Sequence, residues 1–221
     1  QQLLNAVPVA SLYAVLAFGY AIAFSVTKRA DVTYGAIFAF AGQTWLLFAD
    51  FGWNRLWLVL PATLALGAGA GLFGGLWAAG FVGRAVMRPL AKASPNAVTV
   101  ASVGVLIALT ESARLAADTK QLWLPPFLSQ PVRFWSEGGF AVTLTPIQML
   151  NTAGFCLLIL AGSLYLNRSA FGRRWRAISD DSLAASLLGV NAGRVFLLSY
   201  CAAGLVAATA GVLATFYYGT M

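Results

Sequence analysis

Two stretches of the sequence have the residue spacing of nucleotide-binding or catalytic motifs. Residues 69–74 (GAGLFG) have the glycine spacing of the dinucleotide fingerprint, which holds a pyrophosphate at the start of a helix. Ser25 and Lys28 have the spacing of the first β-lactamase motif, in which the serine is the nucleophile. The first stretch lies inside an apolar run and lacks both a preceding strand and a following acidic residue, and the second lacks its partner motifs. Neither stretch is therefore expected to carry chemistry.

The side chains that most often serve catalysis or metal binding are scarce. The chain has no histidine, which is the commonest metal ligand and general base. Cys156 and Cys201 lie in apolar segments, and we interpret them as packing residues without a metal or disulfide role. No glycine loop continues into Gly-Lys-Ser or Gly-Lys-Thr, so the chain has no P-loop for ATP. We therefore expect no catalytic residue, metal site or cofactor, and we predict that the chain is not an enzyme.

The composition indicates a membrane protein. Of the 221 residues, 60% are hydrophobic and 10% are charged, whereas soluble domains carry about 25% charged residues. An apolar run of about 20 residues is long enough to cross the hydrocarbon as a helix. The sequence predicts one all-α domain over residues 1–221, a polytopic transmembrane helix bundle with about six spans. The spans are roughly Leu3–Thr27, Val32–Ala49, Leu56–Val82, Ala97–Ala116, Pro146–Leu166 and Val195–Tyr217, and a re-entrant segment is an alternative for the second.

The basic residues predict the orientation of the spans, because cytoplasmic loops carry an excess of Lys and Arg. If residues 168–194 are cytoplasmic, ten of the 14 basic residues lie inside and four outside. Residues 168–191 are then a cytoplasmic segment, and residues 117–145 are an external loop. The net charge of +7 is a signal of topology in this interpretation. We expect no nucleic-acid partner, because the basic residues form no continuous stripe.

Two features are expected on the external side. In the loop, three prolines exclude helix from its first half, and the apolar runs on either side of residues 137–139 predict a small β-hairpin. Trp45, Trp53 and Trp57 flank a shorter outer loop at residues 50–55, and we interpret them as anchors at the membrane interface.

Small residues recur at every fourth position of the third span. Gly67, Gly71 and Gly75 continue as Ala79 and Gly83 and so line one face of a helix. Backbones approach closely where side chains are small, so this spacing predicts a helix-packing seam.

Polar residues within the spans are candidates for a translocation pathway, since they are costly in lipid. The candidates are Asn5, Ser11, Tyr13, Tyr34, Gln43 and Ser102. Gln43 is favoured, because its primary amide has the most hydrogen-bonding groups to satisfy. Glu111 is better explained as one half of a helix-end ion pair with Arg114.

The charged segment between the fifth and sixth spans predicts an amphipathic helix followed by a short one. Asp180 and Asp181 offer an N-cap for a helix over Ser182–Leu188, and Gly189 offers its C-terminal stop. We expect this helix to present Ala184, Ala185 and Leu188 to a soluble partner. From the residues alone, a juxtamembrane helix without a partner is an equal alternative.

The same segment resembles the branched-chain amino acid permease family of ABC importers. The matching residues are Gly172-Arg173, Arg176-Ala177, Asp181 and Ala185-Ser186-Leu187-Leu188-Gly189-Val190-Asn191. Similar matches occur at Arg88-Pro89-Leu90 and from Leu4-Asn5 to Ser11-Leu12-Tyr13-Ala14. The resemblance implies that the segment couples the chain to an ATPase, through Arg173, Arg176, Asp180, Asp181, Ala185, Leu188, Gly189 and Asn191.

The resemblance also implies the setting of the protein. It implies a permease subunit in the bacterial inner membrane that imports branched-chain or other amino acids. Its expected partners are ABC ATPase subunits, a sister permease or second copy, a periplasmic substrate-binding protein and membrane lipid. Members of the family continue with further helices beyond the position of Met221. Residues 31–35 (DVTYG) keep only the glycine of the family's NFAHG motif, which leaves urea or short amides open as substrates. A secondary transporter or channel is the alternative function.

Overall fold

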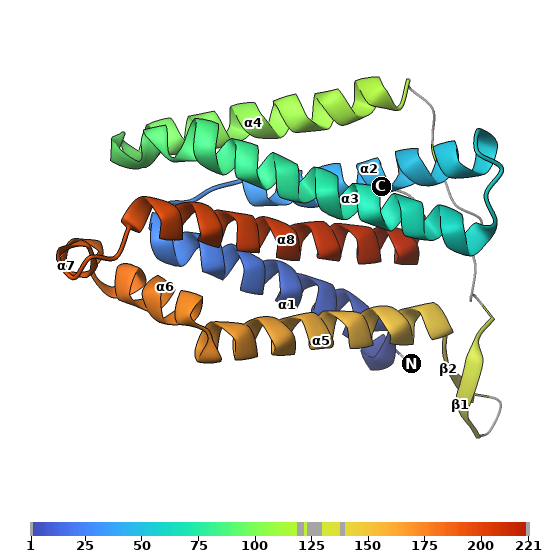
Figure 1. The fold of residues 1–221 in the computed structure, drawn as a ribbon. Coiled ribbons are helices and arrows are strands. Elements are labelled where there is room, and N and C mark those ends of the chain that lie inside the picture. The colour runs from blue at the N-terminus through green and yellow to red at the C-terminus, as the bar shows by residue number, and fades with distance from the viewer. Residues whose placement is uncertain (1, 119–121, 123–129, 138–139, 220–221) are drawn as a thin grey trace.

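The computed structural model describes residues 2–118, 122, 130–137 and 140–219 and confirms the predicted all-α fold (Figure 1). Five of the six predicted spans are helices long and apolar enough to cross a membrane. The remaining predicted span is the second one, α2. It is one unbroken helix of 22 residues, about 33 Å long at 1.5 Å per residue. The long helices are α1 Gln2–Thr27, α2 Thr33–Asn54, α3 Leu60–Phe81, α4 Pro95–Ala116, α5 Pro146–Arg168 and α8 Ala192–Tyr218.

The short elements lie at the two ends of the bundle. A π-helix over Val82–Met87 and a 3₁₀ helix over Pro89–Lys92 join α3 to α4. Two short helices, α6 Ala170–Asp180 and α7 Ser182–Leu187, join α5 to α8 at one end, here called the α7 end (Figure 1). The strands β1 Val132–Glu137 and β2 Phe140–Leu144 lie at the other end, here called the hairpin end. They pair in antiparallel register, which confirms the predicted hairpin, while its turn and the proline-rich stretch 123–129 lie outside the described residues.

Local sequence signals determine where several helices begin. Pro61, Pro95 and Pro146 occupy the first turn of their helices, where the missing N–H is not needed. Thr145 forms a capping box with Gln148, in which each side chain bonds the other residue's backbone N–H. The spans therefore start close to where proline and polar caps interrupt the apolar runs.

Helix α8 is the centre of the bundle, and α1, α2, α3 and α5 pack against it. Alanine and glycine fill most of its buried positions, so its neighbours approach closely. Gly204 lies against Ala79 of α3, and Gly211 lies against the Phe38 carbonyl of α2. Helices α2, α3 and α8 are therefore in close backbone contact with one another.

The expectation that Trp45 anchors the protein at the membrane interface is wrong. Its side chain is fully buried, stacks at a tilt on Phe216 with ring centroids 4.4 Å apart, and donates a hydrogen bond of 3.2 Å from Nε1 to the Leu64 carbonyl. The reason is that α2 continues to Asn54, so Trp45 lies two turns inside its helix and meets the glycine face of α3. Trp53 and Trp57 are exposed, as an interface position requires.

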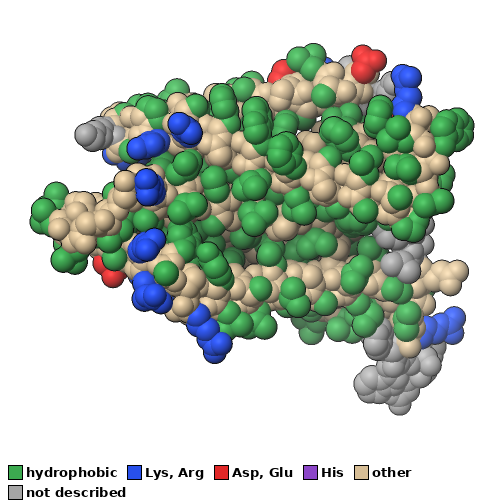
Figure 2. Space-filling view, viewed as in Figure 1, with side chains coloured by type: hydrophobic (Ala, Val, Ile, Leu, Met, Phe, Trp, Pro, Cys, Tyr) green, Lys and Arg blue, Asp and Glu red, His purple; other side chains and the backbone are tan. Residues whose placement is uncertain are grey.

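Basic residues gather at the α7 end (Figure 2). This end includes the C-termini of α1, α3 and α5, the connector to α4, the α6 helix and the start of α8, which together carry ten Lys and Arg. Its acidic residues are Asp31, Asp180 and Asp181. Ten basic and three acidic side chains give this end a formal net charge of about +7. The two ends of the bundle thus differ strongly in charge.

Candidate functional site

The candidate site at the α7 end begins with the amphipathic helix α6. Ser169 ends α5 and caps α6, because its hydroxyl accepts a hydrogen bond of 2.9 Å from the Gly172 N–H. A Cβ on Gly172 would collide with the backbone carbonyl of Leu166, so glycine at this position lets α6 fold back on the end of α5. The two helices therefore meet at a sharp turn rather than through a flexible linker.

Two side chains, those of Trp175 and Arg176, anchor α6 to the bundle. Trp175 packs against the core, and its Nε1–H donates to the Ile22 carbonyl of α1 at 3.2 Å. Arg176 donates to the Leu166 carbonyl at 3.0 Å and to Asn167 Oδ1 at 3.3 Å. These contacts join α6 to both α1 and α5.

The short helix α7 is built by local capping. Asp181 Oδ1 accepts hydrogen bonds from the backbone N–H groups of Leu183 at 2.8 Å and Ala184 at 3.1 Å. Gly189 then adopts φ +84°, a left-handed conformation that favours glycine and reverses the chain. Asn191 Oδ1 accepts from the Arg194 N–H at 3.0 Å and starts α8. Of the two predicted capping aspartates, Asp181 makes these bonds, while Asp180 is an exposed residue at the end of α6.

The expectation that Ala185 faces a partner is wrong. Ala185 is only 3% exposed and packs with Ile178 of α6 and Val195 of α8. The left-handed turn at Gly189 folds the chain back, and the Val190 N–H bonds the Ala185 carbonyl at 3.1 Å, which holds this side of α7 against the bundle. The side chains that point away are larger: Leu183, Leu187 and Leu188 are 72%, 82% and 85% exposed. The remaining predicted contact residues, Arg173, Asp180 and Asn191, are also exposed.

A polar cluster that the sequence did not reveal lies where the start of α2 meets α8. Asp31 Oδ1 accepts from the Thr33 N–H at 2.8 Å and from its hydroxyl at 2.6 Å, while the Tyr200 hydroxyl donates to Oδ2 at 2.7 Å. The hydroxyls of Thr33 and Tyr200 also contact each other, and both residues are buried. The cluster joins the start of α2 to the third turn of α8. An Asp two residues before a Thr at a helix start is a local signal for such a cap, but Tyr200 carries no sequence signal of its role.

The connector between α3 and α4 joins the same region. Arg29 donates hydrogen bonds from Nη1 to the carbonyls of Leu90 and Ala93 in the connector. The π-helix packs on α8, since a Cβ on Gly83 would lie 2.9 Å from the Tyr200 ring. Segments of π-helix occur frequently at functional sites. The start of α2, the π-helix and α8 therefore meet around Tyr200.

The six candidate pathway residues are spread over the bundle. Tyr34 is buried, and its hydroxyl lies against Gly19 with no hydrogen-bond partner among the described residues. Ser11 and Ser102 donate to carbonyls of their own helices, Pro8 and Thr99, at 2.7 Å each. Gln43 is half-buried on α2, and Asn5 and Tyr13 are exposed on α1. They therefore do not converge on one cavity, and their role in a pathway stays a prediction.

The three glycines of the third span lie where helices meet. A Cβ on Gly67 would lie 2.8 Å from the Trp45 carbonyl, and one on Gly71 would lie 2.8 Å from the Ala41 carbonyl, both in α2. A Cβ on Gly75 would lie 2.5 Å from the Cβ of Ala208 in α8. These distances leave no room for a side chain at any of the three positions.

In the described part of the chain, no group of three or more His, Cys, Asp or Glu residues is placed so that it could hold a metal ion. Cys156 is exposed on α5, and Cys201 is partly buried on α8.

Comparisons with known proteins fit this arrangement. Residues 2–221 match the family described as branched-chain amino acid transport system, permease component. The chain is 26% identical to the high-affinity branched-chain amino acid transport system permease protein LivH of Salmonella typhimurium, over 100% of this chain and 72% of that protein. It is 27% identical to BraD of Pseudomonas aeruginosa, a protein with the same description, with the same coverage. It is also 29% identical to the autoinducer 2 import system permease protein LsrC of Yersinia enterocolitica, over 92% of this chain and 50% of that protein. No solved structure matches the chain.

Proposed function

Because the chain belongs to the branched-chain amino acid transport system permease family, a family of multi-pass inner-membrane permeases, we propose that it forms the translocation pathway of an ABC importer for branched-chain or other amino acids. The pathway subunit itself performs no chemistry, and ATP is hydrolysed by partner ATPase subunits. The proposed substrate class is supported by the similarity to LivH and BraD, which are named for branched-chain amino acids. Other relatives are named for galactofuranose and autoinducer 2, so family membership alone does not determine the substrate.

The observation that carries the proposal is the construction of residues 168–191. Helix α7 projects three exposed leucines from the most basic end of the bundle, while its other side is held by Ala185, Ile178 and Val195. Exposed leucines on a rigid support form a docking surface for an apolar cleft. A partner bound there would push on α6, which Trp175 and Arg176 join to α1 and α5. The segment thus has both a contact surface and a mechanical connection to the spans.

The orientation follows from charge. The excess of Lys and Arg at the α7 end makes it the cytoplasmic end by the positive-inside rule, where an ATPase is available. The hairpin end then faces the periplasm and offers residues 117–145 to a substrate-binding protein. A second permease subunit, either a sister protein or another copy of this chain, completes the pathway.

Reconstitution with the ATPase subunits tests the docking surface. Leu187→Asp places a charge on the most projecting side of α7, so substrate-stimulated ATP hydrolysis should fall at least tenfold while the protein still inserts and folds. Ala177→Asp, on the exposed side of α6, is the matched control and should keep most of the stimulation. Equal stimulation by both variants would contradict docking through α7.

A further inference from the structure

The turn from α5 into α6 concentrates positive charge. Four arginines, here called the basic corner, fall within nine residues: Arg168, Arg173, Arg174 and Arg176. Figure 2 shows Lys and Arg side chains gathered over this part of the bundle. Arg173 donates from Nη1 to the Arg168 carbonyl at 3.3 Å, and Arg176 donates to the Leu166 carbonyl at 3.0 Å. Both carbonyls belong to the last turn of α5, so the two guanidinium groups lie at the same helix end.

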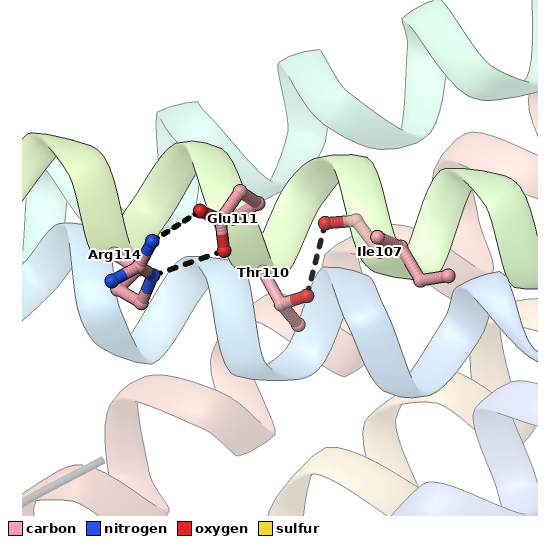
Figure 3. A network of polar contacts seen from close by, with 4 residues as sticks. All are labelled: Ile107, Thr110, Glu111 and Arg114. Atoms are coloured by element: carbon pink, nitrogen blue, oxygen red, sulfur yellow. Dashed lines mark hydrogen bonds and ion pairs between the residues drawn. The ribbon is translucent and has the colours of Figure 1, made fainter.

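The basic corner has no carboxylate within ion-pair distance in the part of the chain that the structure describes. The ion pair between Glu111 and Arg114 lies elsewhere, near the hairpin end of α4, with 3.0 Å between Nε and Oε2 (Figure 3). Among the described residues, none of the aspartates at the α7 end takes part in an ion pair. Like charges that are held together repel one another unless an anion lies between them. The basic corner therefore has the charge of a site for an external anion.

The basic corner lies at the depth of the lipid headgroups. Helix α5 has 23 residues and is about 34 Å long, and the hydrocarbon core that it crosses is about 30 Å thick. Its last residue, Arg168, therefore lies at the membrane boundary. On α6, the indole of Trp175 bonds the Ile22 carbonyl, five residues before the end of α1 at Thr27. Helix α6 is thus level with the last turns of a span and does not project beyond the bundle.

Aromatic side chains beside the arginines fit the same depth. Tyr165 is 58% exposed on the last turn of α5 and stacks on Phe171 of α6, with ring centroids 6.1 Å apart. Tyrosine favours the membrane–water interface, where its ring contacts apolar chains and its hydroxyl reaches water. Arg173 and Arg174 follow on α6, and both are exposed. The corner therefore combines an interfacial aromatic pair with accessible guanidinium groups.

An apolar strip of α5 leads to the basic corner. Leu157, Leu160 and Leu164 are exposed, as is Arg168 at the end of the helix. At 100° per residue these four positions fall within a sector of about 80°. One side of α5 thus offers hydrocarbon contact along the span and a positive charge at its boundary.

We propose that the basic corner binds the phosphate of an anionic phospholipid, whose acyl chains lie along the apolar strip of α5. A guanidinium group has five N–H donors and binds phosphate through two of them, and Arg173 donates one hydrogen bond within the described residues. Basic residues near the surface attract anionic lipid, whereas phosphatidylcholine has no net charge. The bound headgroup neutralises the crowded arginines and holds α6 at the bilayer surface. This inference needs only a chain that spans a membrane, so it is independent of the importer proposal.

Native mass spectrometry of the detergent-purified protein tests the site. The probes are phosphatidylglycerol and phosphatidylcholine with the same acyl chains, each added in a titration. The protein should bind phosphatidylglycerol at least fivefold more tightly, and Arg173→Gln with Arg174→Gln should reduce this preference at least threefold. Arg84→Gln with Arg194→Gln is the matched control, because it removes two exposed arginines from other elements of the same end. This control should keep the preference.

Two further measurements separate charge from folding and lipid from free anion. Arg173→Lys with Arg174→Lys keeps the positive charges, and lysine also binds phosphate, so this variant should keep most of the preference. An excess of inorganic phosphate should leave phosphatidylglycerol bound, because the acyl chains add contacts along α5. Displacement of the lipid by inorganic phosphate would contradict the proposal and indicate a site for a free anion.

Three other results would overturn the inference. Equal loss of preference in the two glutamine variants would show that only the net charge of the α7 end matters. Equal loss in the glutamine and lysine variants of Arg173 and Arg174 would show an effect on structure rather than on charge. Unchanged lipid preference combined with weaker assembly with the ATPase subunits would show that these arginines serve an acidic protein surface. ATP-dependent uptake tests the importer proposal separately, since lipid binding is measured on this chain alone.

Discussion

Substituting Gly71 by alanine should destabilise the bundle, although alanine is the better helix former. The added Cβ would lie 2.8 Å from the Ala41 carbonyl and 3.0 Å from both the Trp45 Cβ and the Val212 Cγ2. These neighbours belong to α2 and α8, whose backbones are held by further close contacts, so α3 must shift away from both. Overpacking of this kind costs about 1–3 kcal/mol.

Gly69→Ala is the matched control, because it makes the same chemical change on the same helix. No atom lies within 4 Å of the position of its Cβ, so the substitution adds only helix propensity, about 0.8–1 kcal/mol in favour of folding. Because both variants gain this helix propensity, they should differ by the overpacking cost alone, about 1–3 kcal/mol.

Thermal unfolding in detergent measures this difference. For a chain of this size each kcal/mol shifts the midpoint by about 2–4 °C, so Gly71→Ala should unfold about 2–12 °C below Gly69→Ala. Equal midpoints, or a higher one for Gly71→Ala, would refute the reasoning that α3 meets α2 and α8 through a seam without room for side chains.

Three further predictions concern the α7 end. The substitutions Asp31→Asn and Tyr200→Phe should each destabilise the protein, because the two side chains share a hydrogen bond of 2.7 Å. A double-mutant cycle should show a coupling energy of about 0.5–3 kcal/mol between them. Strictly additive shifts of the unfolding midpoint would contradict a direct bond. Gly189→Val should strain a residue at φ +84° by about 1–2 kcal/mol and reduce the stimulation of ATP hydrolysis. Gly189→Asn should lose less stimulation, because asparagine tolerates the left-handed region. Equal stimulation by the two variants would show that the turn does not position α7. In a background without Cys156 and Cys201, Arg174→Cys should resist a membrane-impermeant thiol reagent in intact cells while Arg133→Cys is labelled, and the reverse pattern would invert the topology.

The sequence predicted most of the architecture, because the signals for spans are local. Proline and polar caps define the starts of α3, α4 and α5, and the hydrophobic runs between them have the length of a membrane crossing. The same holds for α7, since Asp181, Gly189 and Asn191 act on residues within four positions of themselves. Patterns of this range can be read without knowing the fold.

The errors and omissions concern contacts between distant segments. Asp31 and Tyr200 are 169 residues apart, and Trp175 lies 153 residues from the carbonyl it binds. The sequence predicts that the second span ends at Ala49 and so places Trp45 at the interface. Helix α2 extends five residues further, which brings the indole against the glycines of α3. The sequence places Ala185 on the outside of α7, whereas the structure packs it against Ile178 and Val195. Which side of α7 is buried depends on the position of α8, and the local sequence does not contain that information. Such orientations depend on tertiary packing.

Energised uptake tests the central claim most directly. The complete complex, consisting of this chain with its companion permease, ATPase and binding-protein subunits, is reconstituted in proteoliposomes and supplied with radiolabelled leucine or another amino acid. An ABC permease predicts accumulation only when ATP is hydrolysed, and no accumulation when Leu187→Asp disconnects α7 from the ATPase. Accumulation driven by a proton or sodium gradient in the absence of ATP would contradict the account and indicate a secondary transporter.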